Sequence, residues 1–408
     1  MRKQTMVALL VPLSFLALCA ARAFGATPPQ SQNQQPQLQQ PQQPQQQQKP
    51  QSQYQQPQGK GAPRVDLVIA LDTSSSMDGL IDATRAKLWD VVTLLARAKP
   101  QPVLRIGLIS YGNDGYPSEN GWIRKESDLT TDLDAVYAKL FALRTNGGTE
   151  YVARAVHSAV HEMQWDNTEQ TLRIVFVAGN EPADQDPTIP LADAAKDAID
   201  HHVRVNTIYC GSEANVEKNG WEHLALLARG GFNSIDQNEV AAIATPMDAE
   251  LAKLSDALND TYVAYGKAAA EKKANQVAQD KNARSLGTSA AAGRAHAKAS
   301  AMYFAPEWDL VDAQRASGGA ALKGMSAAAL PPAMAAMPAP AREAYVADKA
   351  KKRAELQQQI SALAARRDGF IKSEKAKAPK KAGKAASLDD ALSNTIEREA
   401  TSDLKLKF

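Results

Sequence analysis

The stretch from Val65 to Met77 constrains the fold of this chain most strongly. It reads Val-Asp-Leu-Val-Ile-Ala-Leu-Asp-Thr-Ser-Ser-Ser-Met, an apolar strand that leads directly into an Asp-x-Ser-x-Ser loop. The Asp72 carboxylate and the Ser74 and Ser76 hydroxyls are then expected at the carboxyl end of a buried strand, where open α/β sheets bind ligands. Such hard oxygen donors suit a hard divalent cation. The alternative is that a serine only caps the following helix.

Three further runs predict the rest of a parallel sheet. Residues 105–111, 172–178 and 203–209 are short and rich in β-forming residues, and amphipathic segments of helix length separate them. This alternation is typical of βαβ units. Between the runs, residues 146–150 read Asn-Gly-Gly-Thr-Glu, a glycine turn that brings Thr149 to the start of a helix. We therefore expect the Thr149 hydroxyl at the same edge of the sheet as Asp72.

These motifs, taken in order, resemble those of a von Willebrand factor A domain over residues 64–246. The resemblance implies an α/β fold, a Rossmann-like doubly wound and mostly parallel sheet. It also implies a metal-ion-dependent adhesion site, whose first part matches Asp72, Ser74 and Ser76 and whose second part matches Thr149. The implied cofactor is Mg²⁺, with Mn²⁺ or Ca²⁺ as alternatives.

The third part of the implied site departs from the family pattern. Where the family commonly has Thr-Asp-Gly after the fourth strand, this chain reads Ala-Gly-Asn-Glu, so that Gly179 occupies the aspartate position. Asn180 and Glu181 are the candidate substitutes. When the protein supplies less negative charge, the bound ion is a stronger Lewis acid toward a partner's carboxylate, but the free ion is held more weakly. The alternative is that the loop has lost the metal and only the scaffold remains.

The N-terminal segments predict an extracytoplasmic location. Residues 1–25 have the charged start, apolar core and small residues of a signal peptide. A lipoprotein signal would need a small residue before Cys19, where Leu18 stands. Residues 26–63 are a Gln/Pro-rich linker whose composition predicts disorder. We expect a periplasmic or secreted protein without a transmembrane span after signal cleavage, and Cys210, then its one cysteine, as a packed core residue.

Residues 247–408 form an α-helical, Ala/Lys-rich C-terminal region. Apolar residues recur at helical spacing at Leu251, Leu254, Leu258, Tyr262 and Tyr265. A second helical pattern begins near residue 341, and Leu356, Ile360 and Leu363 in it approximate a coiled-coil seam, although packing of this helix on its neighbours is the favoured interpretation. Between the two, the run Trp-Asp-Leu-Val-Asp-Ala at 308–313 is expected to dock the region onto another helix or onto the α/β domain. Similar segments follow A domains in bacterial envelope proteins.

The charge of the chain gives no argument for a nucleic-acid partner. The formal net charge is +2, so no global attraction to nucleic acid is expected. A local basic cluster could touch an anionic envelope surface, although a solvated tail is the favoured interpretation. Its members are Lys372, Lys375, Lys377, Lys380, Lys381 and Lys384.

Sequence motifs of enzymes are not found. The chain has no phosphate-binding Gly-x-x-x-x-Gly-Lys-Ser/Thr loop, no dinucleotide fingerprint and no Gly-x-Ser-x-Gly elbow. His157 and His161 have the i, i+4 spacing of metal ligands, but the glutamate that metalloproteases need is absent, and exposed surface histidines are the favoured interpretation. His201 and His202 are expected at a helix end.

These observations together predict a protein-interaction or adhesion module that acts outside the cytoplasm, and no enzyme. In this hypothesis, a divalent cation at Asp72, Ser74, Ser76 and Thr149 binds an acidic group of a partner. The loops 112–116 and 181–186 would give specificity. The alternative is a metal-free structural scaffold of the cell envelope that acts through its helical tail.

Overall fold

The computed structural model describes residues 61–236, 243–377 and 387–408. Its α/β part is built on a six-stranded sheet in the order β3-β2-β1-β4-β5-β6. The strands are β1 (Arg64–Asp72), β2 (Val103–Tyr111), β3 (Ile123–Thr130), β4 (Thr171–Gly179), β5 (Val203–Tyr209) and β6 (Phe232–Ser234). Only β3 runs antiparallel to its neighbour. The predicted doubly wound, mostly parallel sheet is confirmed, whereas the edge strands β3 and β6 were not predicted.

The position of β1 between β2 and β4 determines where the polar loop lies. Asp72 pairs with Tyr111 of β2, and Leu71 pairs with Ala178 of β4. Since β1 is covered on both faces, its side chains form a nearly continuous apolar run. The carboxyl ends of β1, β2 and β4 therefore meet at one edge of the sheet.

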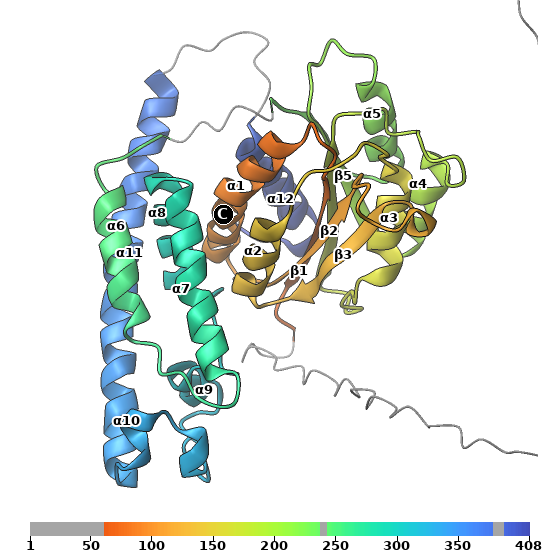
Figure 1. The fold of residues 1–408 in the computed structure, drawn as a ribbon. Helices are drawn as coiled ribbons and strands as arrows, with labels where there is room; N and C mark the ends of the chain where they lie inside the picture. The colour runs from red at the N-terminus through yellow and green to blue at the C-terminus, as the bar shows by residue number, and fades with distance from the viewer. Residues whose placement is uncertain (1–60, 237–242, 378–386) are drawn as a thin grey trace, which may run out of the picture. The chain divides into compact units, whose positions relative to one another are not determined.

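Helices cover both faces of the sheet (Figure 1). One layer consists of α1 (Asp78–Arg97), α2 (Leu133–Ala142) and α12 (Leu388–Leu404). The other consists of α3 (Val152–Glu162), α4 (Leu191–Asp200) and α5 (Lys218–Leu227). A short 3₁₀ helix, η1 (Ser118–Asn120), precedes β3.

The last helix, α12, completes the core of the α/β part. Its residues Leu392 and Ile396 are buried in the same apolar cluster as Leu67 of β1 and Val92 of α1. The predicted domain boundary at residue 246 stays a prediction. The packing of α12 means that a fragment ending there would expose apolar surface on the sheet and on α1.

The remaining helices form an elongated helical part. They are α6 (Asp248–Asn259), α7 (Ala269–Ser285), α8 (Thr288–Ala299), α9 (Leu310–Ala316), η2 (Ala327–Ala329), α10 (Pro332–Ala335) and α11 (Ala339–Lys377). The expected apolar stripe does not continue as one helix, because α6 ends at Asn259, before Tyr262 and Tyr265. Ile360 of α11 packs with residues of α6 and α8, as expected for a helix that packs on its neighbours. A coiled coil stays a prediction.

The aromatic run after α8 docks onto α11, as one of the expected alternatives. The ring of Trp308 stacks on Tyr262, with ring centroids 5.6 Å apart. Asp309 accepts two hydrogen bonds from the Arg353 guanidinium of α11, at 2.7 and 3.2 Å. The Arg353 guanidinium also lies 3.9 Å from the centre of the Tyr262 ring. The bidentate ion pair thus fixes this segment on α11, and the Tyr262 ring, which contacts both Trp308 and Arg353, is a second link.

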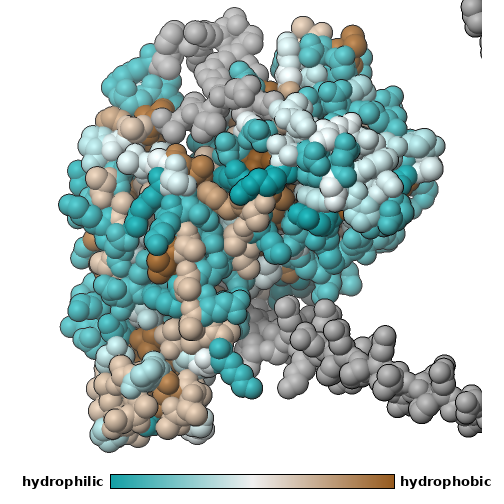
Figure 2. Space-filling model, viewed as in Figure 1, coloured by the Kyte–Doolittle hydropathy of each residue, from teal (hydrophilic) through white to brown (hydrophobic). Residues whose placement is uncertain are grey.

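The surface of the helical part is mostly hydrophilic on the face drawn in Figure 2. Apolar side chains gather over the end that carries α10. Within the described ranges, no helix combines the length and the hydropathy needed to cross a bilayer.

Lys375 of the basic cluster is paired with Asp390 at 3.1 Å. The predicted signal peptide, most of the predicted linker and Lys380, Lys381 and Lys384 lie outside the described residues.

A buried ion-pair network joins the helical part to the α/β part. Arg294 of α8, 1% exposed, donates to Asp134 of α2 at 2.7 Å and also pairs with Asp280 of α7. Its guanidinium lies 4.8 Å from the centre of the Trp89 ring of α1. Lys298 adds a second buried cation, 2.9 Å from Asp280. Since each charge is buried with a partner, removal of any one leaves an uncompensated charge.

Replacing Asp134 tests this interface. Asp134→Ala should lower the free energy of unfolding of the full chain by about 3–5 kcal/mol, because the guanidinium of Arg294 stays buried without that partner. Asp82→Ala is the matched control, because the Asp82 side chain pairs with Arg85 but is 57% exposed. This substitution should cost less than about 1 kcal/mol. Denaturant unfolding of both variants gives the comparison. Equal losses would show that α8 does not bury Arg294 against α2.

Candidate metal-ion-dependent adhesion site

The first loop of the candidate site begins at a buried carboxylate. Asp72 is 0% exposed, and its Oδ1 accepts a hydrogen bond of 2.7 Å from the Ser74 backbone N–H. The Ser74 and Ser76 hydroxyls lie 3.4 Å apart. Helix α1 begins only at Asp78, and no side chain caps it. The interpretation of these serines as helix caps is therefore wrong.

Backbone hydrogen bonds join the second loop to the first. Ser75 N–H donates to the Gly147 carbonyl at 3.0 Å, and Gly147 N–H donates to Ser75 Oγ at 3.1 Å. Asn146 N–H donates to the Thr73 carbonyl at 3.0 Å. Gly147 has a φ of +82°, which favours glycine at this position. The half-buried Thr149 lies two residues further along this loop, and its role as a ligand stays a prediction.

The second loop also brings a carboxylate that the sequence analysis missed. Glu150 is 3% exposed. A Cβ added to Gly112 would lie 2.7 Å from Asp72 Oδ1 and 2.8 Å from Glu150 Cγ, so the two acidic side chains converge on the backbone of Gly112. The only sequence signal was its place directly after Thr149. Among the described residues, Asp72 Oδ2 and Glu150 Oε2 are buried without a hydrogen-bond partner.

Burial and neighbouring negative charge raise the pKa of both carboxylates. Burial, followed by the charge of Glu150, raises the pKa of Asp72 from 3.8 to about 8, although the Ser74 N–H opposes the rise. Burial also raises the pKa of Glu150 from 4.5 to about 7, and the charge of Glu181 adds to the rise. The site thus disfavours two bare negative charges and favours any cation that can lie between them.

Tyr111 explains why glycine replaces the aspartate of the third loop. A Cβ at Gly179 would lie 2.6 Å from Tyr111 Oη, 3.0 Å from Trp221 Cη2 and 3.1 Å from Asp72 Oδ2. The Tyr111 hydroxyl is held there by a hydrogen bond of 2.9 Å to the Ala178 carbonyl. The space that the first atom of an aspartate side chain would need is therefore already filled.

The two candidate substitutes in the third loop differ in their contacts. The Asn180 side-chain N–H donates to Ser76 Oγ at 3.2 Å, which brings Asn180 to the first loop. Glu181 is exposed, and its carbonyl accepts a hydrogen bond of 2.8 Å from the Trp221 indole N–H. The charge of Glu181 raises the pKa of both Asp72 and Glu150, so its side chain acts on the site at least through the electric field.

The resulting set of donors fits a hard divalent cation. Carboxylate, hydroxyl and amide oxygens come from three loops, as Mg²⁺, Mn²⁺ and Ca²⁺ prefer. The unpartnered oxygens of Asp72 and Glu150 are the specific observation, because a buried carboxylate oxygen without a partner is unfavourable. The expected shortage of negative charge at Gly179 is therefore offset by Glu150.

Comparison with known proteins assigns the α/β part to a family. Residues 66–248 match the family model described as the von Willebrand factor type A domain. This part of the chain is a von Willebrand factor A domain. Such domains are generally interaction modules rather than enzymes. No curated protein matches the chain significantly.

Several solved structures are similar to the A domain. Proximal thread matrix protein 1 from the mussel byssus, with a zinc-occupied adhesion motif, is 12% identical, with 44% of this chain and 43% of that chain covered and a TM-score of 0.35. A von Willebrand factor type A protein from Catenulispora acidiphila is 16% identical, with 44% and 41% covered and a TM-score of 0.34. The pilus adhesin SpaC from Lactobacillus rhamnosus GG is 16% identical, with 43% and 28% covered and a TM-score of 0.33. Each match spans less than half of the compared protein.

The raised pKa values predict how stability depends on pH when no divalent ion is present. Between pH 4 and pH 8 the folded protein holds a proton on Asp72 that the unfolded chain releases. The free energy of unfolding of this site should therefore fall as pH rises through this window. Denaturant unfolding in chelator at pH 5 and pH 8 measures the fall, and Asp72→Asn should reduce it. An equal fall in wild type and Asp72→Asn would contradict a raised Asp72 pKa.

A double-mutant cycle tests the steric role of Tyr111. Gly179→Ala should lower the free energy of unfolding by about 1–3 kcal/mol, because the added methyl group overlaps the Tyr111 hydroxyl. In the Tyr111→Phe background the same substitution should cost clearly less, because the overlapping oxygen is gone. Thermal or denaturant unfolding of the four proteins gives the coupling. Additive effects of the two substitutions would show that the hydroxyl does not occupy the space beside Gly179.

Proposed function

We propose that the A domain binds a divalent cation at this site and, through the cation, an acidic group of a protein partner. The observation that carries the proposal is the burial of Asp72 beside Glu150 with one oxygen of each carboxylate unpartnered. A cation would relieve both the repulsion between the carboxylates and the missing contacts. We further propose, from residues 1–25, that this takes place in the periplasm or outside the cell.

The ligands would come from all three loops. Asp72, Ser74 and Ser76 offer donors from the first loop, and Thr149 and Glu150 offer donors from the second. Asn180 adds an amide oxygen through the third loop, and Glu181 adds negative charge. When bound, the ion would supply a Lewis-acid position for an incoming carboxylate, in place of a water molecule.

The charges of the site make the cation necessary for binding an acidic partner. Glu181 is exposed, and Asp114 lies exposed in the neighbouring loop, where its backbone N–H donates to Asn146 at 3.2 Å. Without a cation, these groups and Glu150 repel a carboxylate that approaches Asp72. With a divalent cation in place, the local field favours that carboxylate. The interaction should therefore need both the ion and a negatively charged partner group.

The variant Glu150→Gln tests whether Glu150 is a metal ligand or only a structural carboxylate. The neutral side chain keeps the shape but removes the repulsion, so it should raise the free energy of unfolding of the metal-free protein at pH 8 by about 1 kcal/mol. The same variant should bind Mg²⁺ at least about tenfold more weakly, because a ligand charge is lost. Denaturant unfolding and calorimetric titration of the full chain measure the two effects, and Glu119→Gln, at an exposed position, should change neither.

The partner chemistry is tested with two matched peptides. A peptide with one aspartate in an otherwise uncharged sequence should bind the full chain in Mg²⁺ and not in chelator, whereas the same peptide with asparagine should not bind. Loss of binding in Ser76→Ala, with retention in Ser212→Ala, would place the peptide at the site. If wild type binds no Mg²⁺ or Mn²⁺ at millimolar concentration, the proposal is wrong, and the metal-free scaffold that acts through the helical part takes its place.

A further inference from the structure

We propose a second metal site on the A domain, for a borderline transition-metal ion such as Zn²⁺, formed by His157 and His161 of α3 and Asp197 of α4. Its donors differ in kind from those of the adhesion site, because two of its three ligand atoms are imidazole nitrogens. Zn²⁺ accepts such a mixed set, whereas Mg²⁺ and Ca²⁺ prefer oxygen. The two sites are therefore chemically separable, and this proposal does not depend on the first.

The geometry brings the three side chains to one point. His157 and His161 lie one turn apart on α3, and their ring centroids are 4.3 Å apart. His157 Nδ1 lies 3.0 Å and His161 Nε2 lies 2.7 Å from the same oxygen, Asp197 Oδ2. The ligand atoms of the three residues all lie within 4.8 Å of one another. Tetrahedral Zn²⁺ with bonds of about 2.0–2.1 Å needs ligand atoms about 3.3 Å apart, so only small side-chain adjustments are required.

A third imidazole lies next to these residues. His201 ends α4, and its Nδ1 lies 3.2 Å from Asp197 Oδ1 and 2.8 Å from the Asp197 carbonyl. Its ring is 4.9 Å from the ring of His161. Three imidazoles thus surround one carboxylate, whereas a hydrogen-bonded His–Asp pair needs only one imidazole. The metal-free alternative is that the rings only donate hydrogen bonds to Asp197.

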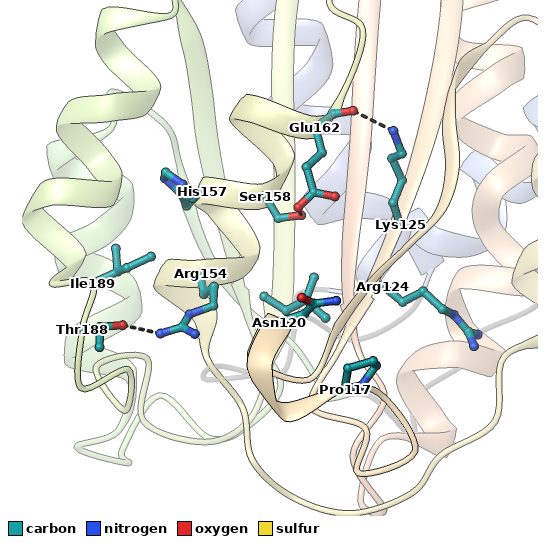
Figure 3. A pocket seen from close by; sticks show the side chains of 11 residues that line it. Pro117, Asn120, Arg124, Lys125, Arg154, His157, Ser158, Glu162, Thr188 and Ile189 are labelled. Atoms are coloured by element: carbon teal, nitrogen blue, oxygen red, sulfur yellow. Dashed lines mark hydrogen bonds between the residues drawn. The ribbon is translucent and has the colours of Figure 1, made fainter. Parts of the chain in front are cut away.

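The site is accessible from solvent. The side chains of His157 and His161 are 47% and 41% exposed, and that of Asp197 is 23% exposed. His157 also lines a surface pocket of about 780 Å³, whose lining is shown in Figure 3. In that pocket Arg154 is already paired with Asp186 at 2.8 Å. An ion held by three protein atoms on this surface keeps a coordination position open for water or for a group of another molecule.

The test is a titration of the full chain with Zn²⁺ in the presence of millimolar Mg²⁺. The Mg²⁺ competes for the oxygen ligands of the adhesion site but does not bind imidazoles. Wild type should bind one Zn²⁺ that is weakened at least about tenfold in His161→Ala and in Asp197→Asn. The matched control is His223→Ala, which removes an exposed histidine of α5 and should change nothing. Ser76→Ala should also leave this Zn²⁺ in place, because Ser76 belongs to the adhesion site.

Histidine ring NMR provides a second readout. One equivalent of Zn²⁺ should shift the ring signals of His157 and His161 and leave those of His223 unchanged. Unchanged Zn²⁺ affinity in the double variant His157→Ala/His161→Ala would overturn the proposal. So would Zn²⁺ that shifts no signal of these two rings, since the cluster would then be only a group of hydrogen-bonded surface side chains.

Discussion

The burial of Asp72 beside Glu150 is the constraint on which the candidate site depends. Asp72 lies at the end of the central strand, where β2 and β4 flank it, so its carboxylate cannot turn to solvent. The loop around Gly147 is bonded to the first loop and brings Glu150 to the same place. Two carboxylates in this position are unfavourable alone and favourable with a cation. The proposal of one cation site formed by the three loops rests on this geometry.

The helical part contacts α2, the helix that precedes the second loop. Arg294 holds α2 through Asp134, and α2 leads into the segment that carries Glu150. On the inner side, Arg85 of α1 donates to the Leu143 carbonyl at 3.0 Å, at the end of α2. Arg85 thus holds the start of the second loop, whereas Arg294 holds the first turn of α2, at the other end of that helix.

The sequence predicted the features that depend on local pattern and missed those that depend on long-range packing. The strand before Asp72, the loop with Thr149 and the mostly parallel sheet follow from apolar runs and glycine turns. Nothing local shows that α12 completes the core, because its partners in α1 and β4 lie more than about 200 residues earlier in the chain. The sequence pattern predicts Tyr111 only as part of a strand, yet its hydroxyl fills the space beside Gly179. His157 and His161 were visible as a pair, but Asp197 meets them only after α3 and α4 pack together.

The most direct test of the cation site is crystallography of the full chain in Mn²⁺, with the ion located by its anomalous scattering. If the proposed cation site is right, a peak lies between the Asp72 and Glu150 carboxylates, within coordination distance of oxygens from the first two loops, with a hydroxyl or water at the open position. A structure in millimolar Mn²⁺ that shows no anomalous peak there, with both carboxylates still buried and unpartnered, would contradict the proposed cation site.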